Sequence, residues 1–166
     1  MTDLFGRPPD KVMWLELACR GIHFDVIISG NPLSAVTSSA KQDYKHETDM
    51  QTIVYTNSKQ QAVGSISATM ESVLENSPNN GDVIPLTGDD GLQFKVFTMH
   101  AFSQGGIDGV DDSILVSDTT RLLPKLKIMP ATKAADCGVS NTRCRCSYRI
   151  GLAPSMYSLV QEMGRC

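Results

Sequence analysis

The sequence predicts an α/β fold in which an open, mainly parallel β-sheet is flanked by helices. Three observations lead to this prediction. Short β-rich or apolar runs recur at residues 52–56, 82–86 and 126–129, without the polar alternation of a strand that has one face in water. Segments with a helical spacing of apolar residues follow the first two runs. Strands that alternate with helices indicate βαβ units, in which the strands lie parallel.

The composition is that of one soluble globular domain. The chain has 166 residues, of which 41% are hydrophobic and 20% charged, and this length suits a single hydrophobic core. The N-terminus has no basic region followed by an apolar run, and no stretch reaches the roughly 18 apolar residues of a membrane span. Five cysteines form an odd and sparse set, which suits a reducing compartment. We therefore expect an intracellular protein without a membrane segment.

The first fifty residues give the weakest pattern. Residues 12–19 are apolar, residues 24–28 predict a short strand, and residues 34–50 are polar. We interpret residues 1–50 as a lead-in segment or inter-domain linker, and residues 51–166 as the domain.

The first clear unit is a strand followed directly by a helix. Residues 52–56 form the strand. Ser58 and Gln61 have the spacing of a helix N-cap pair. Four apolar residues then recur at helical spacing until Asn76-Ser77-Pro78 ends the helix; these are Ala62, Ile66, Met70 and Val73.

The remaining elements repeat this pattern. The sequence predicts a second strand at 82–86, a helix at 92–102 and a glycine-rich loop at 103–112. A third buried strand at 126–129 is followed by a turn-rich stretch to Asn141. The last unit is a strand at 144–152 and a helix at 155–163, which Pro154 introduces.

The motifs argue against autonomous nucleotide hydrolysis by this chain. A phosphate-binding loop needs the pattern G-x-x-x-x-G-K-[ST], and no Gly-Lys pair occurs. No adjacent Asp-Glu pair is present to hold catalytic magnesium. The three histidines are scattered and have no nucleophile motif nearby, so we interpret them as structural.

The cysteines can be interpreted in two ways, as zinc ligands or as ordinary strand residues. Cys137, Cys144 and Cys146 could contribute to a zinc site, which prefers four ligands at recurrent spacings. Cys144 and Cys146 can also simply point to the same face of one strand. We predict no metal.

Charge is distributed unevenly along the chain. The net charge is −3, so no global positive field favours nucleic acid. Residues 121–149 nevertheless contain seven positive residues against one acid, Asp136. This run is either a solvated face or an anion-binding surface.

The end of the chain adds Gln161 and Arg165, one helical turn apart. An arginine there could meet phosphate oxygens with its planar fork, although both residues could equally be ordinary surface residues.

Three blocks, taken in order, resemble the second RecA-like domain of RecQ-type DNA helicases of superfamily 2. IVYTNSKQQA at 53–62 is similar to motif IV, and MPATKAADCGVSN at 129–141 is similar to motif V. IGLAPSMYSLVQEMGRC at 150–166 resembles motif VI, whose pattern is Pro-Ser, an apolar helix and Gln-Glu-x-Gly-Arg-x-Gly-Arg. The resemblance covers residues 51–166.

This resemblance implies a RecA-like fold and the C-terminal motor domain of an ATP-dependent 3′-to-5′ DNA helicase. ATP and magnesium would be held mainly by a P-loop-bearing first RecA-like domain that the chain does not contain, and the other partner would be DNA, expected to be single-stranded. In a eukaryote the location would be nuclear. Gln161, Gly164 and Arg165 would face the nucleotide, with Gln161 and Arg165 acting in catalysis by stabilising charge on the phosphates.

The same resemblance assigns the DNA contacts. Five residues would contact the phosphodiester backbone: Asn57, Ser58, Lys59, Thr132 and Lys133.

The chain departs from the family pattern at several positions. It stops after the first motif VI arginine, Ser140 replaces a carboxylate, Thr87-Gly88-Asp89 replaces Tyr-His-Ala-Gly, and residues 109–124 form an insertion. We therefore expect a fragment that is inactive alone. The alternative is a stand-alone or degenerate nucleic-acid-binding module without motor activity, and chance matches in an unrelated α/β binding domain are a third reading.

Overall fold

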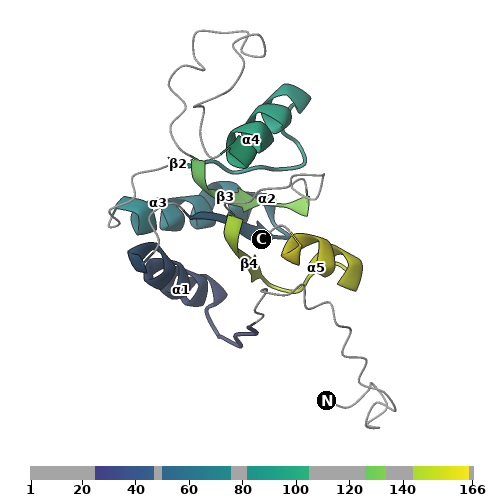
Figure 1. Cartoon of the computed structure of the whole chain (residues 1–166). Helices are drawn as coiled ribbons and strands as arrows, with labels where there is room; N and C mark the ends of the chain where they lie inside the picture. Colours follow the sequence, from purple (N-terminus) through teal and green to yellow (C-terminus); the bar gives the residue numbers. More distant parts are fainter. Residues whose placement is uncertain (1–24, 47–49, 76–81, 105–125, 134–143, 165–166) are drawn as a thin grey trace, which may run out of the picture.

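The protein is a four-stranded, all-parallel β-sheet with helices on both faces, so the predicted α/β class is confirmed (Figure 1). This computed structural model describes residues 25–46, 50–75, 82–104, 126–133 and 144–164. The strand order is β2-β3-β1-β4. In chain order the elements are α1 (Pro32–His46), β1 (Gln51–Thr56), α2 (Lys59–Gln61), the π-helical segment η1 (Ala62–Ile66), α3 (Ser67–Glu75), β2 (Asp82–Val83), α4 (Leu92–Gln104), β3 (Leu126–Ala131), β4 (Cys144–Ile150) and α5 (Met156–Met163).

Strand β1 lies at the centre of the sheet and is buried along its whole length. It pairs with β3 on one side and β4 on the other, so that Tyr55 lies opposite both Ala131 and Arg149. Such burial on both faces explains why the strand reads as an uninterrupted β-rich run rather than an alternating one. The strand predicted at 52–56 is confirmed.

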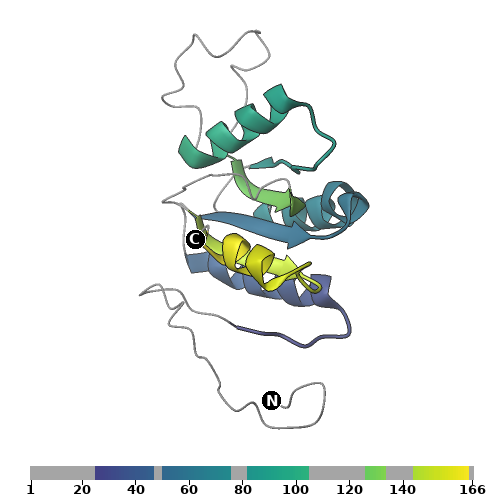
Figure 2. The ribbon, with the colours of Figure 1, turned by 90° about the vertical axis from the view of Figure 1, so that its right-hand side faces the viewer.

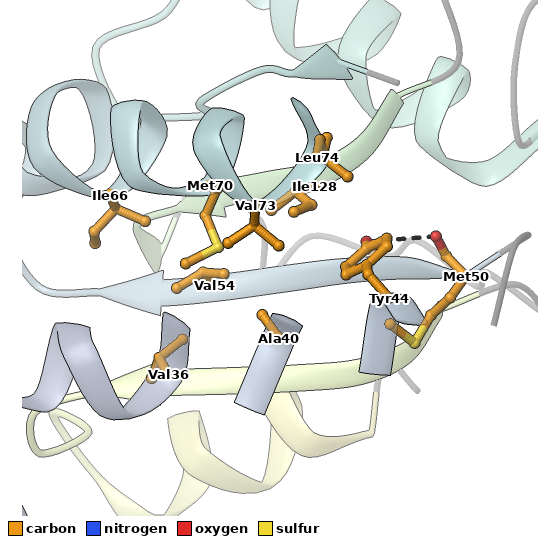
Figure 3. Packing of buried hydrophobic residues seen from close by; sticks show 10 residues of the cluster. All are labelled: Val36, Ala40, Tyr44, Met50, Val54, Ile66, Met70, Val73, Leu74 and Ile128. Atoms are coloured by element: carbon orange, nitrogen blue, oxygen red, sulfur yellow. Dashed lines mark hydrogen bonds between the residues drawn. The ribbon is translucent and has the colours of Figure 1, made fainter. Parts of the chain in front are cut away.

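Helices α1 and α3 cover one face of the sheet. Val36, Ala40 and Tyr44 of α1 pack with residues of α3 and with Val54 of β1 in one buried cluster (Figure 3). Burying a Val, Ile or Met side chain completely stabilises the folded state by about 1.5–3 kcal/mol relative to leaving it exposed. Helix α1 is therefore an integral layer of the domain.

The opposite face carries α4 and α5 (Figures 1 and 2). Ile53 and Tyr55 of β1 pack there with Met129 of β3 and Phe102 of α4. Because side chains alternate along a strand, neighbours on β1 reach different clusters, and Val54 lies on the α1 face. The two clusters are the two halves of one core, separated by the sheet.

The helix after β1 begins as the sequence predicts. Ser58 is the N-cap, and its Oγ accepts a hydrogen bond from the Gln61 backbone N–H at 3.2 Å. The Gln61 side chain reaches back and accepts a hydrogen bond from the Thr56 hydroxyl at 2.9 Å. The π-helical turn η1 interrupts the helix, which the sequence did not reveal.

Residues 25–46 differ from the expectation. Residues 25–30 form no strand, and α1 begins at Pro32. The Asn31 side chain accepts a hydrogen bond from the Ser34 N–H, and a proline is well suited to the first helical position that follows such a cap. The apolar stripe of α1 is narrow, so the polar residues between its members hid the helix.

Three strand ends also differ from the predictions. Strand β3 is longer than predicted and reaches Ala131 instead of residue 129. Strand β2 is shorter than predicted and covers only Asp82–Val83, although Leu86 still forms an isolated bridge to Ala131. Strand β4 ends at Ile150, before the predicted end at residue 152, and Gly151 follows with a φ of 82° that favours glycine.

The two cysteines of β4 do not share a face. The register between β1 and β4 shifts at Gln51/Thr52, which pair with Cys144 and Cys146, so Arg145 is an extra residue between them. Cys144 packs with Ile53 and Tyr55, whereas Cys146 packs against the α1 cluster. The expectation that both point to the same face is therefore wrong, and Cys137 lies outside the described residues.

Replacing Tyr44 with phenylalanine tests the docking of α1. The Tyr44 hydroxyl donates to the Lys127 carbonyl at 3.1 Å and lies 3.1 Å from the Thr52 hydroxyl, and burial raises the pKa of Tyr44 so that the phenol stays neutral. Because Tyr44→Phe leaves buried acceptors without this donor, we expect the free energy of unfolding to fall by about 1–2 kcal/mol in denaturant titrations. The exposed control Tyr157→Phe should change it by less than about 0.5 kcal/mol. Equal values for the two variants would mean that α1 does not dock as described.

Candidate functional site

The residues assigned to DNA contact gather at the carboxyl edge of the sheet. Asn57, Ser58 and Lys59 follow β1, and Thr132 and Lys133 follow β3. Strands β1 and β3 are neighbours in register, with Tyr55 opposite Ala131, so the two segments leave the sheet side by side. Their side chains are exposed, except those of Ser58 and Thr132, which are half-buried.

Backbone hydrogen bonds fix the segment after β3. The Thr132 N–H donates to the Leu86 carbonyl at 3.1 Å, and the Leu86 N–H donates to the Pro130 carbonyl at 2.8 Å. The chain after β2 thus extends the sheet edge beyond the two-residue strand. This places the Thr87-Gly88-Asp89 turn beside the segment after β3.

Lys59 does not face solvent as an unpaired cation. Its Nζ lies 2.6 Å from Asp89 Oδ2 on the neighbouring turn. This hydrogen bond and charge contact raise the pKa of Lys59 and lower the pKa of Asp89, so both stay charged at neutral pH. Any phosphate that binds Lys59 must compete with the Asp89 carboxylate.

The turn that carries Asp89 has its own internal support. The Asp90 carboxylate accepts hydrogen bonds from the Thr87 N–H at 2.6 Å and from the Thr87 hydroxyl at 3.1 Å. The Lys95 ammonium donates to the Gly88 carbonyl at 2.5 Å. Asp89 is consequently held close to Lys59.

Asn57 is tied to the strand that precedes α5. Its Nδ2 donates to the Leu152 carbonyl at 2.8 Å, and its Oδ1 accepts a hydrogen bond from Arg149 Nη2. The same Arg149 nitrogen donates to the Leu152 carbonyl at 3.1 Å. Three segments therefore meet in one polar cluster: the loop after β1, the end of β4 and the turn before α5.

Arg149 and Glu162 form an ion pair in the interior. Arg149 Nη1 lies 2.5 Å from Glu162 Oε1, and the two side chains are only 12% and 3% exposed. Cys146 and Tyr148 of β4 pack toward α1, so Ser147 and Arg149 point to the opposite face, which α5 covers. The pair fixes α5 to the end of β4.

Helix α5 runs back along the sheet from the carboxyl edge (Figure 2). The sequence predicts a helix from residue 155, and in the structure Ser155 is the N-cap, whose Oγ accepts a hydrogen bond from the Ser158 N–H at 3.1 Å. Gln161 is half-buried and donates from its side-chain amide to the Tyr157 hydroxyl at 3.0 Å. Gly164 is the C-cap, and Arg165 lies outside the described residues.

The predicted site residues thus fall into two groups. The five residues assigned to DNA lie at the carboxyl edge. Gln161 and Gly164 lie at the far end of α5, where the Ser147 hydroxyl meets the Glu162 carbonyl at 3.4 Å. The structure does not bring these groups into direct contact in the described part of the chain. Arg149 is the residue that touches elements of both.

The basic run does not form a uniformly solvated face. Lys127 is buried with only 4% of its surface exposed, and Arg149 is engaged in the interior. Lys133 and Arg145 are exposed. Arg121, Lys125 and Arg143 lie outside the described residues.

Two features are absent from the part of the chain that the structure describes. Among the described residues, no group of three or more His, Cys, Asp or Glu side chains is arranged to hold a metal ion. Within the same residues, no helix is both long and apolar enough to span a lipid bilayer.

No protein-family model matches this chain, and no curated protein is significantly similar to it. Its function is therefore inferred from its own residues.

Sequence reasoning missed Arg149, Glu162 and Asp89. Glu162 lies within the last resembling block, whereas Arg149 directly precedes that block and was counted only in the positive run. The alternation of side chains along β4 and the i, i+4 spacing of Ser158 and Glu162 were the available signals. Asp89 had no such signal, because its contact with Lys59 spans two elements that are not neighbours in sequence.

Removing one partner of the interior ion pair should destabilise the domain strongly. Arg149→Met leaves the Glu162 carboxylate buried without this cation, and we expect the free energy of unfolding to fall by about 3 kcal/mol. The double variant Arg149→Met/Glu162→Gln removes both charges and should lose less than the single variant. Denaturant titrations of the two variants test this. A double variant at least as unstable as Arg149→Met would contradict the buried pairing.

Proposed function

We propose that this chain acts as the second RecA-like domain of a RecQ-like, ATP-dependent 3′-to-5′ DNA helicase, in which it contributes nucleotide-sensing and DNA-backbone contacts. The proposal rests mainly on one observation. Residues from the blocks that resemble motif IV and motif V lie together at one edge of the sheet. Asn57, Ser58 and Lys59 stand next to Thr132 and Lys133 because β1 and β3 pair in parallel.

The chemistry of this edge suits a phosphodiester backbone. Lys59 and Lys133 are exposed cations, and the half-buried Ser58 and Thr132 bring hydroxyls to the same edge. Such groups contact phosphate oxygens without reading bases. The expected ligand is single-stranded DNA bound through its backbone.

The end of α5 suits a nucleotide that is held chiefly by another domain. A glutamine side chain has two N–H donors and an acceptor oxygen, so the hydrogen bond to Tyr157 leaves Gln161 capacity for a phosphate or ribose group. When bound, ATP with magnesium would supply the phosphoryl transfer. The P-loop and magnesium-binding acids would come from a first RecA-like domain.

The alternative is a nucleic-acid-binding module without motor activity. The Asp89 contact with Lys59 favours it, because a carboxylate at the DNA edge weakens backbone binding. The two functions differ in one observable property: only the motor domain responds to nucleotide when a P-loop-bearing domain is present.

Salt-dependent DNA binding is the direct test. The full 166-residue chain should bind a fluorescein-labelled oligo(dT), measured by fluorescence anisotropy, and the affinity should fall as salt rises. Two phosphate-contacting lysines give a slope of log K against log salt of about −1.4. Adding a RecQ-type first domain with ATP should change the affinity if this is a motor domain. No binding at low salt would refute both functions, and binding without a nucleotide effect would favour the module.

Asp89→Asn should strengthen DNA binding. The substitution releases the Lys59 ammonium from its carboxylate partner, so we expect the affinity for oligo(dT) to rise about 3-fold. The matched control is Glu75→Gln, which removes the same charge from an exposed residue at the far end of the helical run that begins at Lys59. Equal tightening in both variants would indicate a general charge effect and would contradict a role for Lys59 at this edge.

A further inference from the structure

Arg149 joins the two groups of candidate site residues. One guanidinium nitrogen, Nη1, binds Glu162 on α5 at 2.5 Å. The other, Nη2, donates to Asn57 Oδ1 in the loop after β1 and to the Leu152 carbonyl. Neither the order of the sequence blocks nor the resemblance assigned Arg149 any role.

We propose that Arg149 is a positioning residue that couples helix α5 to the DNA-contacting loop after β1. This inference rests on the proposed function, in which the loop after β1 contacts DNA and the end of α5 faces a nucleotide. Through Arg149, the orientation of Asn57 depends on the position of Glu162. Glu162 is the next residue after Gln161, so a change at the nucleotide-facing end of α5 reaches the loop.

The geometry requires an arginine. A guanidinium presents several N–H donors in a rigid planar fork, so one side chain can hold a carboxylate and an amide oxygen in fixed relative positions. A lysine ammonium at the same place could remain near Glu162 as a point charge, but it could not span both partners. Burial makes this need for an arginine stronger, because the Glu162 side chain is only 3% exposed and its charge needs a fixed counter-ion.

Asn57 is held in a state that can still bind a ligand. One Nδ2 hydrogen is used by the Leu152 carbonyl and one Oδ1 lone pair by Arg149. The side-chain amide therefore keeps a second N–H, and the residue is exposed. Arg149 thus fixes the plane of the amide whose remaining donor would meet a phosphate oxygen.

The first experiment is a double-mutant cycle on DNA affinity. The full chain and its variants Arg149→Lys, Asn57→Ala and Asn57→Ala/Arg149→Lys are titrated with labelled oligo(dT). Arg149→Lys should weaken binding about 5-fold in the natural background, and it should have almost no effect when Asn57 is alanine. The control Arg145→Lys makes the same change at an exposed position of β4 and should leave the affinity within about 2-fold. An equal effect of Arg149→Lys in both backgrounds would overturn the proposal.

A second measurement separates this coupling from DNA binding. In ¹H–¹⁵N spectra of the full chain without DNA, Glu162→Gln should shift the Asn57 side-chain amide signals and the backbone signals of residues 57–59. Arg149→Lys should shift the same signals. Unchanged Asn57 signals in both folded variants would overturn the coupling. Shifted signals in a chain that binds no DNA would retain the link and refute the proposed function.

Discussion

The burial of β1 on both faces is the constraint on which the other features depend. The strand has α1 and α3 against one face and the α4 cluster against the other, and it has a parallel partner along each edge. Parallel pairing brings the ends of β1, β3 and β4 to one edge of the sheet, although they are separated by dozens of residues in sequence. The polar segments after these strands must therefore gather there, where open α/β sheets bind ligands. The candidate site follows from this topology.

Several positively charged side chains of the domain are buried or paired with an acid. Lys127 and Arg149 are used inside the fold, and Lys59 is matched by Asp89, so the positive run of the sequence does not become a broad positive surface. An interior ion pair is costly to desolvate and adds little net stability, but it specifies geometry because either charge alone would be unfavourable. The main effect of the Arg149–Glu162 pair is therefore to orient α5 and the loop after β1. Its net contribution to stability is smaller.

The predictable part of the structure was the part with a repeating pattern. Strand β1, the Ser58 cap and helix α5 have local signals, and all were predicted. Helix α1 was missed because its few core-facing residues stand among polar ones. The prediction that Cys144 and Cys146 point to the same face was wrong because one extra residue, Arg145, shifts the register of β4. No local sequence pattern reveals such a shift. Arg149 was counted only as one member of the positive run, since its partners Glu162 and Asn57 come together only through the fold.

Hydrogen–deuterium exchange of the full chain, with and without oligo(dT), tests the central claim most directly, because it reads every segment of the edge at once. The account predicts that DNA slows exchange at residues 57–59 and 132–133 together, and that protection extends into α5 through Arg149. In the Arg149→Lys variant, protection of α5 should disappear while that of residues 132–133 remains. Protection confined to other faces of the domain, or equal protection of α5 with and without Arg149, would contradict a coupled DNA-binding edge.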